Sequence, residues 1–379
     1  MASREGRPSA PAGGAAVKLS VPAHIQAIPA YVPGKPVEEL ERERGICGAV
    51  KLASNENPLG PSPLAVEAAR QCLASVHRYP ESGGFELTRR LAARLNLTPG
   101  NIVLGNGSDD IIAMLATAFL QPGDEVIMAR PSFQMYEIAA RAAGAVPVEV
   151  PLTGFRSDLE AMAGRVTPRT RMVFVNSPHN PTGSIVTRAE IEALMAALPA
   201  DVLLVLDEAY IEFVRAPDHP DSRHYAAAGR PVVGLRTFSK AYGLAGMRIG
   251  YGIMPAAAAD ILHRVRQPFN VSLPARAAAA AALDDQTFLS RTLETVHDGV
   301  DFLYDSLRGL GLDCLPTQSN FLFFRVPRPA QAVFEALLDR GVIVRPLASY
   351  GYSEHLRVSV GRPEENRRFI AALRQALAA

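Results

Sequence analysis

In RMVFVNSPHNPTG, residues 171–183, a run of apolar, β-prone residues ends in a polar loop. The same arrangement recurs in VLLVLDEAY, residues 202–210, and in VVGLRTFSK, residues 232–240. Most of these runs do not alternate between apolar and polar residues, which is typical of strands covered on both faces. The three stretches therefore predict strands of a buried, mostly parallel sheet.

Further strands and helices extend this pattern on both sides of the three stretches. EVIMA (125–129), AVPVEV (145–150) and IGYGI (249–253) are also β-prone, and helical patterns occupy residues 109–120 and 188–198. Strands that alternate with helices along the chain are typical of a parallel sheet with helices on its faces. The middle of the chain is therefore predicted to be an α/β domain.

The character of the chain changes after about residue 270. The alanine-rich segment 274–283 opens a long helical region that reaches roughly Leu310. A strand at 320–326, a helix at 330–341, two strands in VIVRP and HLRVSV, and a closing helix follow. These elements predict a second, smaller α+β domain.

The length of the chain also indicates two domains, because 379 residues are too many for one ordinary hydrophobic core. We expect the following division of the chain: a flexible N-terminal tail at 1–18, a large domain at 51–272, and a discontinuous small domain at 19–50 and 273–379.

The composition argues against several classes of protein. With 39 basic and 38 acidic side chains, the formal net charge of +1 predicts no broad surface for nucleic acid or an anionic membrane. Three cysteines without paired spacing predict neither a disulfide framework nor a metal site. No stretch approaches the roughly 18 consecutive apolar residues of a membrane-spanning helix, and the first residues lack the apolar segment of a secretory signal. We expect a cytoplasmic location.

Polar side chains stand where the predicted strands end. Asn176–Gly183 follows the first strand, Asp207–Tyr210 the second, and Lys240 the third, with Arg248 eight residues later. A glycine loop, Gly105–Asp109, precedes a helix, whose N-terminus would attract an anion. Each feature alone has an ordinary explanation as a turn, a helix cap or a solvated charge. Open α/β sheets bind ligands beyond the carboxyl ends of their strands, so the features together predict a binding site.

With this order of motifs, the sequence resembles the fold-type I pyridoxal-phosphate enzymes, and within them the histidinol-phosphate aminotransferase family. The resemblance runs from about Tyr31 to the C-terminus. It rests on eight segments: YVPGK (31–35), KLASNENPLGPSP (51–63), RYP (78–80), GNGSDD (105–110), NSPHNPTG (176–183), DEAY (207–210), RTFSKAYGLAGMRIGY (236–251) and LRVSVG (356–361). It implies a large α/β domain, a smaller α+β domain and a pyridoxal 5′-phosphate cofactor.

The resemblance implies a chemical role for the residues at the predicted strand ends. Lys240 would hold the cofactor through its amine and move a proton between the substrate Cα and the cofactor. Asp207 would keep the pyridine nitrogen protonated, so that the ring accepts electrons. Tyr210 and Asn180 would hydrogen-bond the phenolic oxygen of the cofactor, and the aromatic ring of Phe133 would stack on it.

The same resemblance implies how the anionic groups are held. The cofactor phosphate would be bound by five residues: Gly107, Ser108, Asp109, Ser239 and Arg248. Tyr79 would reach that phosphate from the other subunit of a homodimer. Arg357 would grip the anionic end of the substrate, with Arg345, Tyr31 and Asn180 as further substrate contacts. No metal site is expected.

These roles imply transamination of L-histidinol phosphate with 2-oxoglutarate, a step of histidine biosynthesis, because paired arginines accept both phosphate and carboxylate. An aromatic amino-acid aminotransferase remains open, since such relatives share nearly all of the motifs. A decarboxylase that acts on threonine phosphate also remains open. An effector-binding domain would need an attached DNA-binding module, for which the 18 tail residues are too few. A dinucleotide-binding dehydrogenase is excluded, because Gly105–Asp110 lacks the third glycine of its fingerprint.

Overall fold

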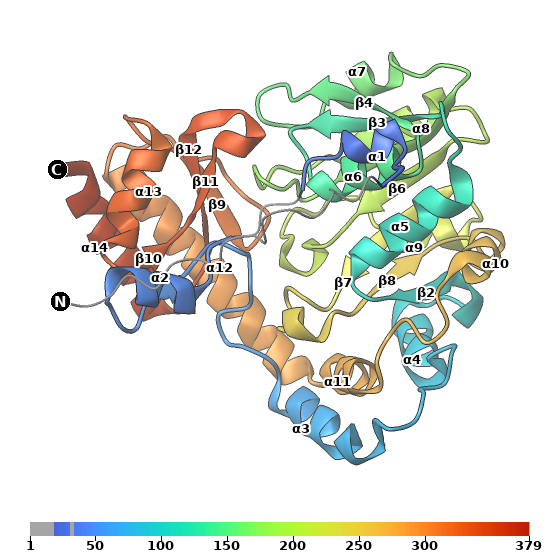
Figure 1. Ribbon diagram of the computed structural model, residues 1–379, viewed down its shortest axis with the longest axis horizontal. Coiled ribbons are helices and arrows are strands. Elements are labelled where there is room, and N and C mark those ends of the chain that lie inside the picture. The colour runs from blue at the N-terminus through green and yellow to red at the C-terminus, as the bar shows by residue number, and fades with distance from the viewer. Residues whose placement is uncertain (1–18, 31–33, 379) are drawn as a thin grey trace, which may run out of the picture.

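The computed structural model describes residues 19–30 and 34–378. The predicted tail and Tyr31 therefore lie outside the described residues. Figure 1 shows two bodies, one around a large sheet and one around a smaller sheet, with the long helix α12 (Gln286–Gly309) running from the smaller body toward the larger. Among the helices of the described residues, none combines the length and apolar character that crossing a bilayer requires.

The large domain is built on a seven-stranded sheet within the described part of the chain. The strands lie in the order β2 (Ile102–Gly105), β8 (Gly250–Ile253), β7 (Val232–Thr237), β6 (Leu203–Asp207), β5 (Thr170–Asn176), β3 (Glu125–Arg130) and β4 (Val146–Pro151). Strand β8 runs antiparallel to both of its neighbours, and the other pairs are parallel. The predicted mostly parallel sheet is confirmed.

Helices cover both faces of this sheet, as the apolar strands predicted. One face is covered by α5 (Ser108–Phe119), α6 (Gln134–Ala142) and α10 (Ala256–Val265), and the other by α7 (Leu159–Ala163), α8 (Arg188–Ala197) and α9 (Ser222–Ala227). On β5, Met172 and Phe174 pack into the first layer, and Val173 and Val175 pack into the second. Because both faces are buried, polar side chains that bind ligands are confined to the strand ends.

The small domain is built from both ends of the described chain. Its antiparallel sheet has the order β11 (Arg345–Leu347), β12 (Tyr352–Ser359) and β9 (Phe321–Arg325). A parallel pair joins β1 (Val50–Lys51) to β10 (Val342–Ile343). The further helices of this body are α2 (Val37–Arg44), α13 (Ala330–Leu338) and α14 (Pro363–Ala378). Leu40 of α2 is buried against Leu338 and Ile343, which fastens the N-terminal segment to this domain.

Two elements predicted in this region are wrong in extent. The predicted helical region from 274 to Leu310 is divided at Asp285 into α11 (Leu273–Asp284) and α12. The Asp285 carboxylate caps α12 by accepting from the Phe288 N–H at 3.0 Å, and it accepts from the Ser62 hydroxyl at 2.5 Å. A capping aspartate starts a new helix rather than continuing the old one. The predicted strand VIVRP is divided between β10 and β11, which belong to different sheets.

Two helices bear on the proposed division into domains. Helix α1 (Ala23–Gln26) packs against α6 of the large domain, although the prediction placed it in the small domain. Helix α11 packs against α3 (Pro63–Cys72) and α4 (Phe85–Leu95), and Figure 1 shows these three helices together beside the large sheet. Buried alanines on α11 allow this close packing. We propose that α1 and α11 belong with the large domain, that Lys51 belongs with β1 in the small domain, and that the rest of the predicted division holds.

The turn after β7 positions Lys240. The N–H of Leu244 donates to the Phe238 carbonyl oxygen at 2.9 Å, and the N–H of Gly243 donates to the Lys240 carbonyl oxygen at 3.0 Å. Gly243 has a φ of 68°, which favours glycine, and a Cβ added there would lie 2.1 Å from the carbonyl oxygen of Gly60. The turn therefore needs glycine for two separate reasons.

We predict that Gly243→Ala lowers the free energy of unfolding by roughly 2–5 kcal/mol, from about 1–2 for the left-handed conformation and about 1–3 for overpacking. Gly229→Ala is the matched control, because Gly229 has a φ of 67° but no atom within 4 Å of an added Cβ. The control should lose only the contribution of the left-handed conformation, about 1–2 kcal/mol. Urea unfolding of both variants measures the difference, and equal losses would contradict a clash with Gly60.

Candidate active site

A cavity of about 300 Å³ lies at the carboxyl ends of β5, β6 and β7, between residues of both domains. The predicted site residues that line it are Ser108, Asp109, Phe133, Asn180, Asp207, Tyr210, Ser239, Lys240, Arg248, Arg345 and Arg357. Gly107 lies next to it, directly before helix α5. The structure therefore brings together side chains from segments that are far apart in the sequence.

Lys240 is partly buried in the wall of this cavity. Its Nζ donates to the Ser54 carbonyl oxygen at 3.2 Å and lies 5.8 Å from the centre of the Tyr210 ring. Burial is the main cause that lowers the pKa of Lys240 to about 8, and the Arg357 guanidinium lowers it further. An appreciable fraction of the amine is therefore unprotonated near neutral pH, as a nucleophile or a base requires.

Asp207 ends strand β6 and is buried. Its Oδ1 accepts from the Ala209 N–H at 3.1 Å, and its Oδ2 accepts from the Tyr136 hydroxyl. Tyr136 in turn stacks on Phe174, with 4.4 Å between the ring centres. Burial raises the pKa of Asp207 to about 6, while the two hydrogen bonds act to lower it. The carboxylate is therefore largely ionised at neutral pH although it is buried.

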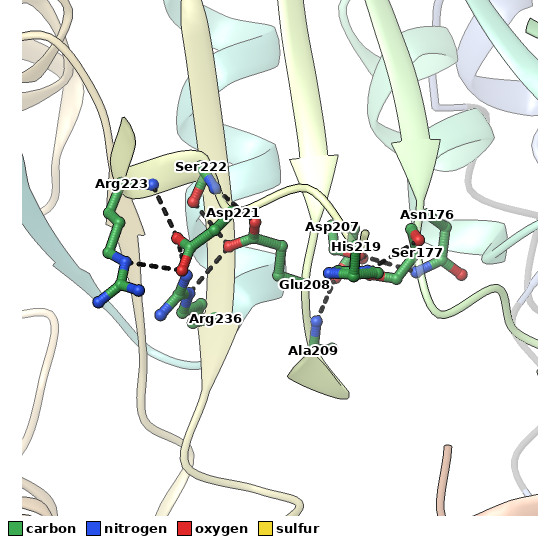
Figure 2. Close-up of polar contacts among 10 residues, drawn as sticks. All are labelled: Asn176, Ser177, Asp207, Glu208, Ala209, His219, Asp221, Ser222, Arg223 and Arg236. Atoms are coloured by element: carbon green, nitrogen blue, oxygen red, sulfur yellow. Dashed lines mark hydrogen bonds and ion pairs between the residues drawn. The ribbon is translucent and has the colours of Figure 1, made fainter. Parts of the chain in front are cut away.

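A buried ion-pair cluster supports the strand ends beside Asp207 (Figure 2). Glu208 accepts from the Ser222 hydroxyl at 2.6 Å and from Arg236 Nε at 2.8 Å, and Arg236 also donates to Asp221 at 2.7 Å. Adjacent strand residues point to opposite faces, so Glu208 faces this cluster and Asp207 faces the cavity. The charge of Glu208 acts to raise the pKa of Asp207, and Arg236 places the opposite charge beside Glu208.

The beginning of α5 and the side chain of Arg248 form a positively polarised corner of the cavity. Arg248 Nη1 lies 3.4 Å from Ser239 Oγ, and Nη2 lies 3.5 Å from Asp109 Oδ2. A Cβ added to Gly107 would lie 2.6 Å from Arg248 Nη2, so the backbone approaches the guanidinium closely. The N–H groups of the first helical turn, the hydroxyls of Ser108 and Ser239 and the guanidinium are suitable donors for a phosphate.

The hydroxyl of Tyr210 faces this cavity from the large domain. It accepts a hydrogen bond from Asn55 Nδ2 at 3.0 Å. Burial raises the pKa of Tyr210 to about 12, so the phenol is neutral and retains its proton at physiological pH. Tyr210 therefore has a hydroxyl proton to donate to a ligand.

Arg345 and Arg357 bring positive charge from the small domain to the cavity. The two residues pair across β11 and β12, so their side chains lie on the same face of the sheet. Arg357 donates from Nη1 to the side-chain oxygen of Asn180 and from Nη2 to the Ala53 carbonyl oxygen, the latter at 2.7 Å. Its guanidinium lies 5.1 Å from the centre of the Phe321 ring. These contacts orient Arg357 and connect the small domain to the loop after β5.

Tyr79 is not among the residues that line the cavity. Its side chain is 83% exposed and stacks on Phe269, with 4.7 Å between the ring centres. Its role in a second subunit therefore stays a prediction.

Sequence reasoning assigned no role to Ser54, Asn55 or Tyr136, although each contacts a predicted residue. Ser54 and Asn55 lie in KLASNENPLGPSP, where no residue type indicates a contact with a distant lysine or tyrosine. Tyr136 follows Phe133, the residue that precedes α6, by three residues, and the two rings pack edge to face with 5.6 Å between their centres. That spacing is the one signal that could have marked Tyr136 as a neighbour of the site.

A comparison with known families agrees with this geometry. The family model described as aminotransferase class I and II matches residues 48–373. The chain belongs to the class I and II aminotransferases. The matched range contains every predicted site residue except Tyr31, so the predicted aminotransferase identity is confirmed.

Known proteins that this aminotransferase resembles carry a more specific name. The histidinol-phosphate aminotransferase of Moorella thermoacetica is 47% identical over 355 residues, which cover 93% of this chain and 92% of that protein. Histidinol-phosphate aminotransferase 2 of Pseudomonas aeruginosa is 48% identical over 356 residues, which cover 93% of this chain and 96% of that protein.

Solved structures give the same fold. The histidinol-phosphate aminotransferase of Sinorhizobium meliloti, solved in complex with pyridoxal-5′-phosphate, superposes with a TM-score of 0.87 at 29% identity and covers 96% of this aminotransferase and 99% of that chain. An aspartate aminotransferase double mutant of Thermus thermophilus superposes with a TM-score of 0.81 at 28% identity and covers 95% and 100%, respectively. The predicted fold-type I architecture is confirmed.

The lowered pKa of Lys240 predicts how its amine reacts. The chain contains four lysines, Lys18, Lys35, Lys51 and Lys240, so labelling of each is resolved by digestion and mass spectrometry. In protein freed of small molecules, the rate at which an aryl sulfonate labels Lys240 should reach half its maximum near pH 8. Lys35 is the internal control, because hydrogen bonds to Glu43 and Glu39 raise its pKa above the usual value of 10.5.

A substitution of Arg357 separates the two causes that lower the pKa of Lys240, which are burial and the charge of Arg357. In Arg357→Gln, the labelling midpoint of Lys240 should rise because a positive neighbour is lost, yet stay below that of Lys35 because burial remains. A Lys240 midpoint equal to that of Lys35 in the unsubstituted protein would refute the lowered pKa.

Proposed function

We propose that this aminotransferase transfers the amino group of L-histidinol phosphate to 2-oxoglutarate with pyridoxal 5′-phosphate as its cofactor, a step of histidine biosynthesis. The proposal rests on the arrangement of one cavity, in which arginines from both domains lie with a lysine whose pKa is lowered. Arg248 and the beginning of α5 come from the large domain, and Arg345 and Arg357 come from the small domain. The names of the relatives from M. thermoacetica and P. aeruginosa support the same substrate.

The chemistry of the side chains in the cavity fits pyridoxal phosphate. The beginning of α5, Ser239 and Arg248 offer donors for its phosphate, and Gly107 leaves the guanidinium room to approach. The Asp207 carboxylate is a suitable partner for a protonated ring nitrogen. The Lys240 amine is the group to which an aldehyde attaches.

Further residues would contact the flat face and the phenolic oxygen of the pyridoxal ring. Phe133 lines the cavity with an aromatic surface that suits stacking. The hydroxyl of Tyr210 and the side chain of Asn180 would hydrogen-bond the phenolic oxygen of the cofactor.

Lys240, Asp207 and Tyr210 would each have a different role in proton transfer. When bound, pyridoxal phosphate supplies an electron-accepting ring that stabilises negative charge at the substrate Cα. Lys240 Nζ takes the proton from Cα, for which its lowered pKa is favourable. Asp207 remains ionised and holds the proton on the ring nitrogen. Tyr210 retains its proton, because its pKa is about 12.

The paired arginines decide which substrates fit. A guanidinium binds phosphate and carboxylate with the same planar, two-pronged geometry. Arg345 and Arg357 would therefore accept the phosphate of histidinol phosphate in one half-reaction and a carboxylate of 2-oxoglutarate in the other. The positive charge of the small domain thus serves both substrates in turn.

We also propose that the active form is a homodimer. Large apolar side chains are exposed on α3 and on the chain that follows it: Leu64, Val66, Leu73, Val76, Tyr79 and Phe85. Exposed large apolar side chains that occur together on neighbouring segments are typical of an interface between subunits. A second copy that covers it would bring Tyr79 to the phosphate of its partner. The cytoplasmic location expected from the sequence stays a prediction.

The substrate assignment is tested by comparing amino donors. With purified protein, pyridoxal phosphate and 2-oxoglutarate, kcat/KM for glutamate formation should be at least a hundredfold higher with L-histidinol phosphate than with L-phenylalanine. A reversed preference would move the assignment to an aromatic amino-acid aminotransferase. No glutamate from either donor, in protein that shows the absorbance of bound cofactor, would favour the decarboxylase.

Two arginine variants test whether Arg345 contacts the phosphate of the substrate. Arg345→Ala should lower kcat/KM for histidinol phosphate about 10- to 100-fold, the loss of a charged hydrogen-bonded pair, and phenylalanine should lose less. Arg325→Ala is the control, because Arg325 lies on the same sheet but is exposed and pairs with Glu354. Equal losses for both substrates in Arg345→Ala would contradict its contact with the substrate phosphate.

The proposal that each active site contains Tyr79 from the other subunit is tested by mixing two inactive variants. Lys240→Ala removes the amine that takes the proton. Tyr79→Ala should remove a phosphate contact from the site of the partner, so this variant should be inactive when pyridoxal phosphate is not in excess. When the two proteins are unfolded, mixed in equal amounts and refolded, about a quarter of full activity should return. Half of the dimers are mixed, and one of the two sites in each mixed dimer is complete. No recovery, or full activity of Tyr79→Ala alone, would rule out the shared site.

A further inference from the structure

Asn55 bridges the small domain and Tyr210 of the large domain. It follows β1 and is buried, with 2% of its surface exposed. Its backbone N–H donates to Ser359 Oγ at 2.8 Å, and its carbonyl oxygen accepts from Asn320 Nδ2 at 3.0 Å. Its side-chain amide contacts Ser359 Oγ at 2.8 Å and Tyr210 Oη at 3.0 Å. Its φ of 54° is one that asparagine tolerates better than most residues.

The contacts of Ser359 determine which way the Asn55 amide is turned. Ser359 Oγ already accepts from the Asn55 backbone N–H, and its single proton is donated to Asn55 Oδ1. Turning the amide around would leave that proton without an acceptor among the described residues, in a side chain that is buried. A buried unpaired donor costs about 1–3 kcal/mol. Asn55 Nδ2 therefore points to Tyr210 and donates to it.

The direction of that hydrogen bond leaves the Tyr210 proton free to point into the cavity. An amide nitrogen donates and does not accept, so Tyr210 cannot give its proton to Asn55. Tyr210 lines the cavity, where Arg357 acts to lower its pKa and Asp207 and Tyr350 act to raise it. Lys240 Nζ also lies 5.8 Å from its ring centre. The proton is thus directed toward the space in which a ligand binds.

We propose that Asn55, held in place by Ser359, is a positioning residue that makes Tyr210 a hydrogen-bond donor toward the bound cofactor. The inference rests on the proposed function, because the acceptor is the phenolic oxygen of pyridoxal phosphate. Donation by Asn55 polarises the Tyr210 hydroxyl and strengthens the hydrogen bond that this hydroxyl donates. Ser359 lies two residues after Arg357 on β12. One strand of the small domain therefore carries a substrate-binding arginine and also sets the donor direction of Tyr210.

The test measures the pH midpoint at which the visible absorbance of the bound cofactor changes. A donor to the phenolic oxygen stabilises the negative charge that this oxygen carries at high pH, so a weaker donor raises the midpoint. Tyr210→Phe, which removes the donor, should raise it by about one unit. Asn55→Gly removes the amide and keeps the backbone conformation, and it should raise the midpoint by about a third as much. Ser359→Ala, which leaves the amide free to turn, should shift it in the same direction.

A double-mutant cycle separates this role from a structural one. If Asn55 acts through Tyr210, Asn55→Gly and Ser359→Ala should shift the midpoint in the natural background and leave it unchanged in the Tyr210→Phe background. Asn57→Gly is the matched control, because Asn57 Nδ2 donates to the Ala241 carbonyl oxygen rather than to Tyr210. Equal shifts in both backgrounds would overturn the inference and leave the proposed function intact. Absence of cofactor absorbance in the unsubstituted protein would overturn both.

Discussion

The parallel pairing of β5, β6 and β7 is the constraint on which the rest of the site depends. Asn176 pairs with Asp207, and Asp207 pairs with Leu235, so the three strands end at one edge of the sheet. Hydrogen bonding between strands therefore sets the spacing of the loops that carry Asn180, Tyr210 and Lys240. A slip of one residue in β6 would turn Asp207 away from the cavity and bring Glu208 into it. The ion pair of Glu208 with Arg236 opposes that slip, because Glu208 would then lose its partner.

The charged side chains at this edge of the sheet are of two kinds: those paired with an opposite charge and those without such a partner in direct contact among the described residues. Arg236 forms an ion pair with Glu208. Burial, by contrast, raises the pKa of Asp207 and lowers the pKa of Lys240, so that it favours the neutral form of each group. A group that must exchange or share a proton needs a pKa close to the working pH, and the shifts of Asp207 and Lys240 bring both groups closer to it. Burial also makes Asp207 dependent on its two hydrogen-bond donors, the Tyr136 hydroxyl and the Ala209 N–H.

The sequence predicted the parts of the molecule that are encoded locally. Strand ends, the loop before α5 and the positions of Asp207 and Lys240 all follow from neighbouring residues. The pairs Tyr136 with Asp207, Asn55 with Tyr210 and Asn55 with Ser359 join residues 71, 155 and 304 positions apart. No local pattern encodes contacts of that kind, because they depend on how segments far apart in the sequence pack against one another. The interruption at Asp285 was missed for the same reason, since its partner Ser62 lies in another segment.

The pairing of β1 with β10 has a consequence for the order in which the chain assembles during translation. The ribosome releases residues 50–51 long before residues 342–343. Strand β1 and the apolar face of α2 therefore have no partners in the small domain until residues 338–343 have emerged. The large sheet, by contrast, is complete once β8 has left the exit tunnel. A prematurely terminated polypeptide would therefore hold Lys240 and Asp207 on a finished scaffold but lack Arg345, Arg357 and Ser359. The side chains that the small domain contributes to the active site are thus synthesised after those of the large sheet.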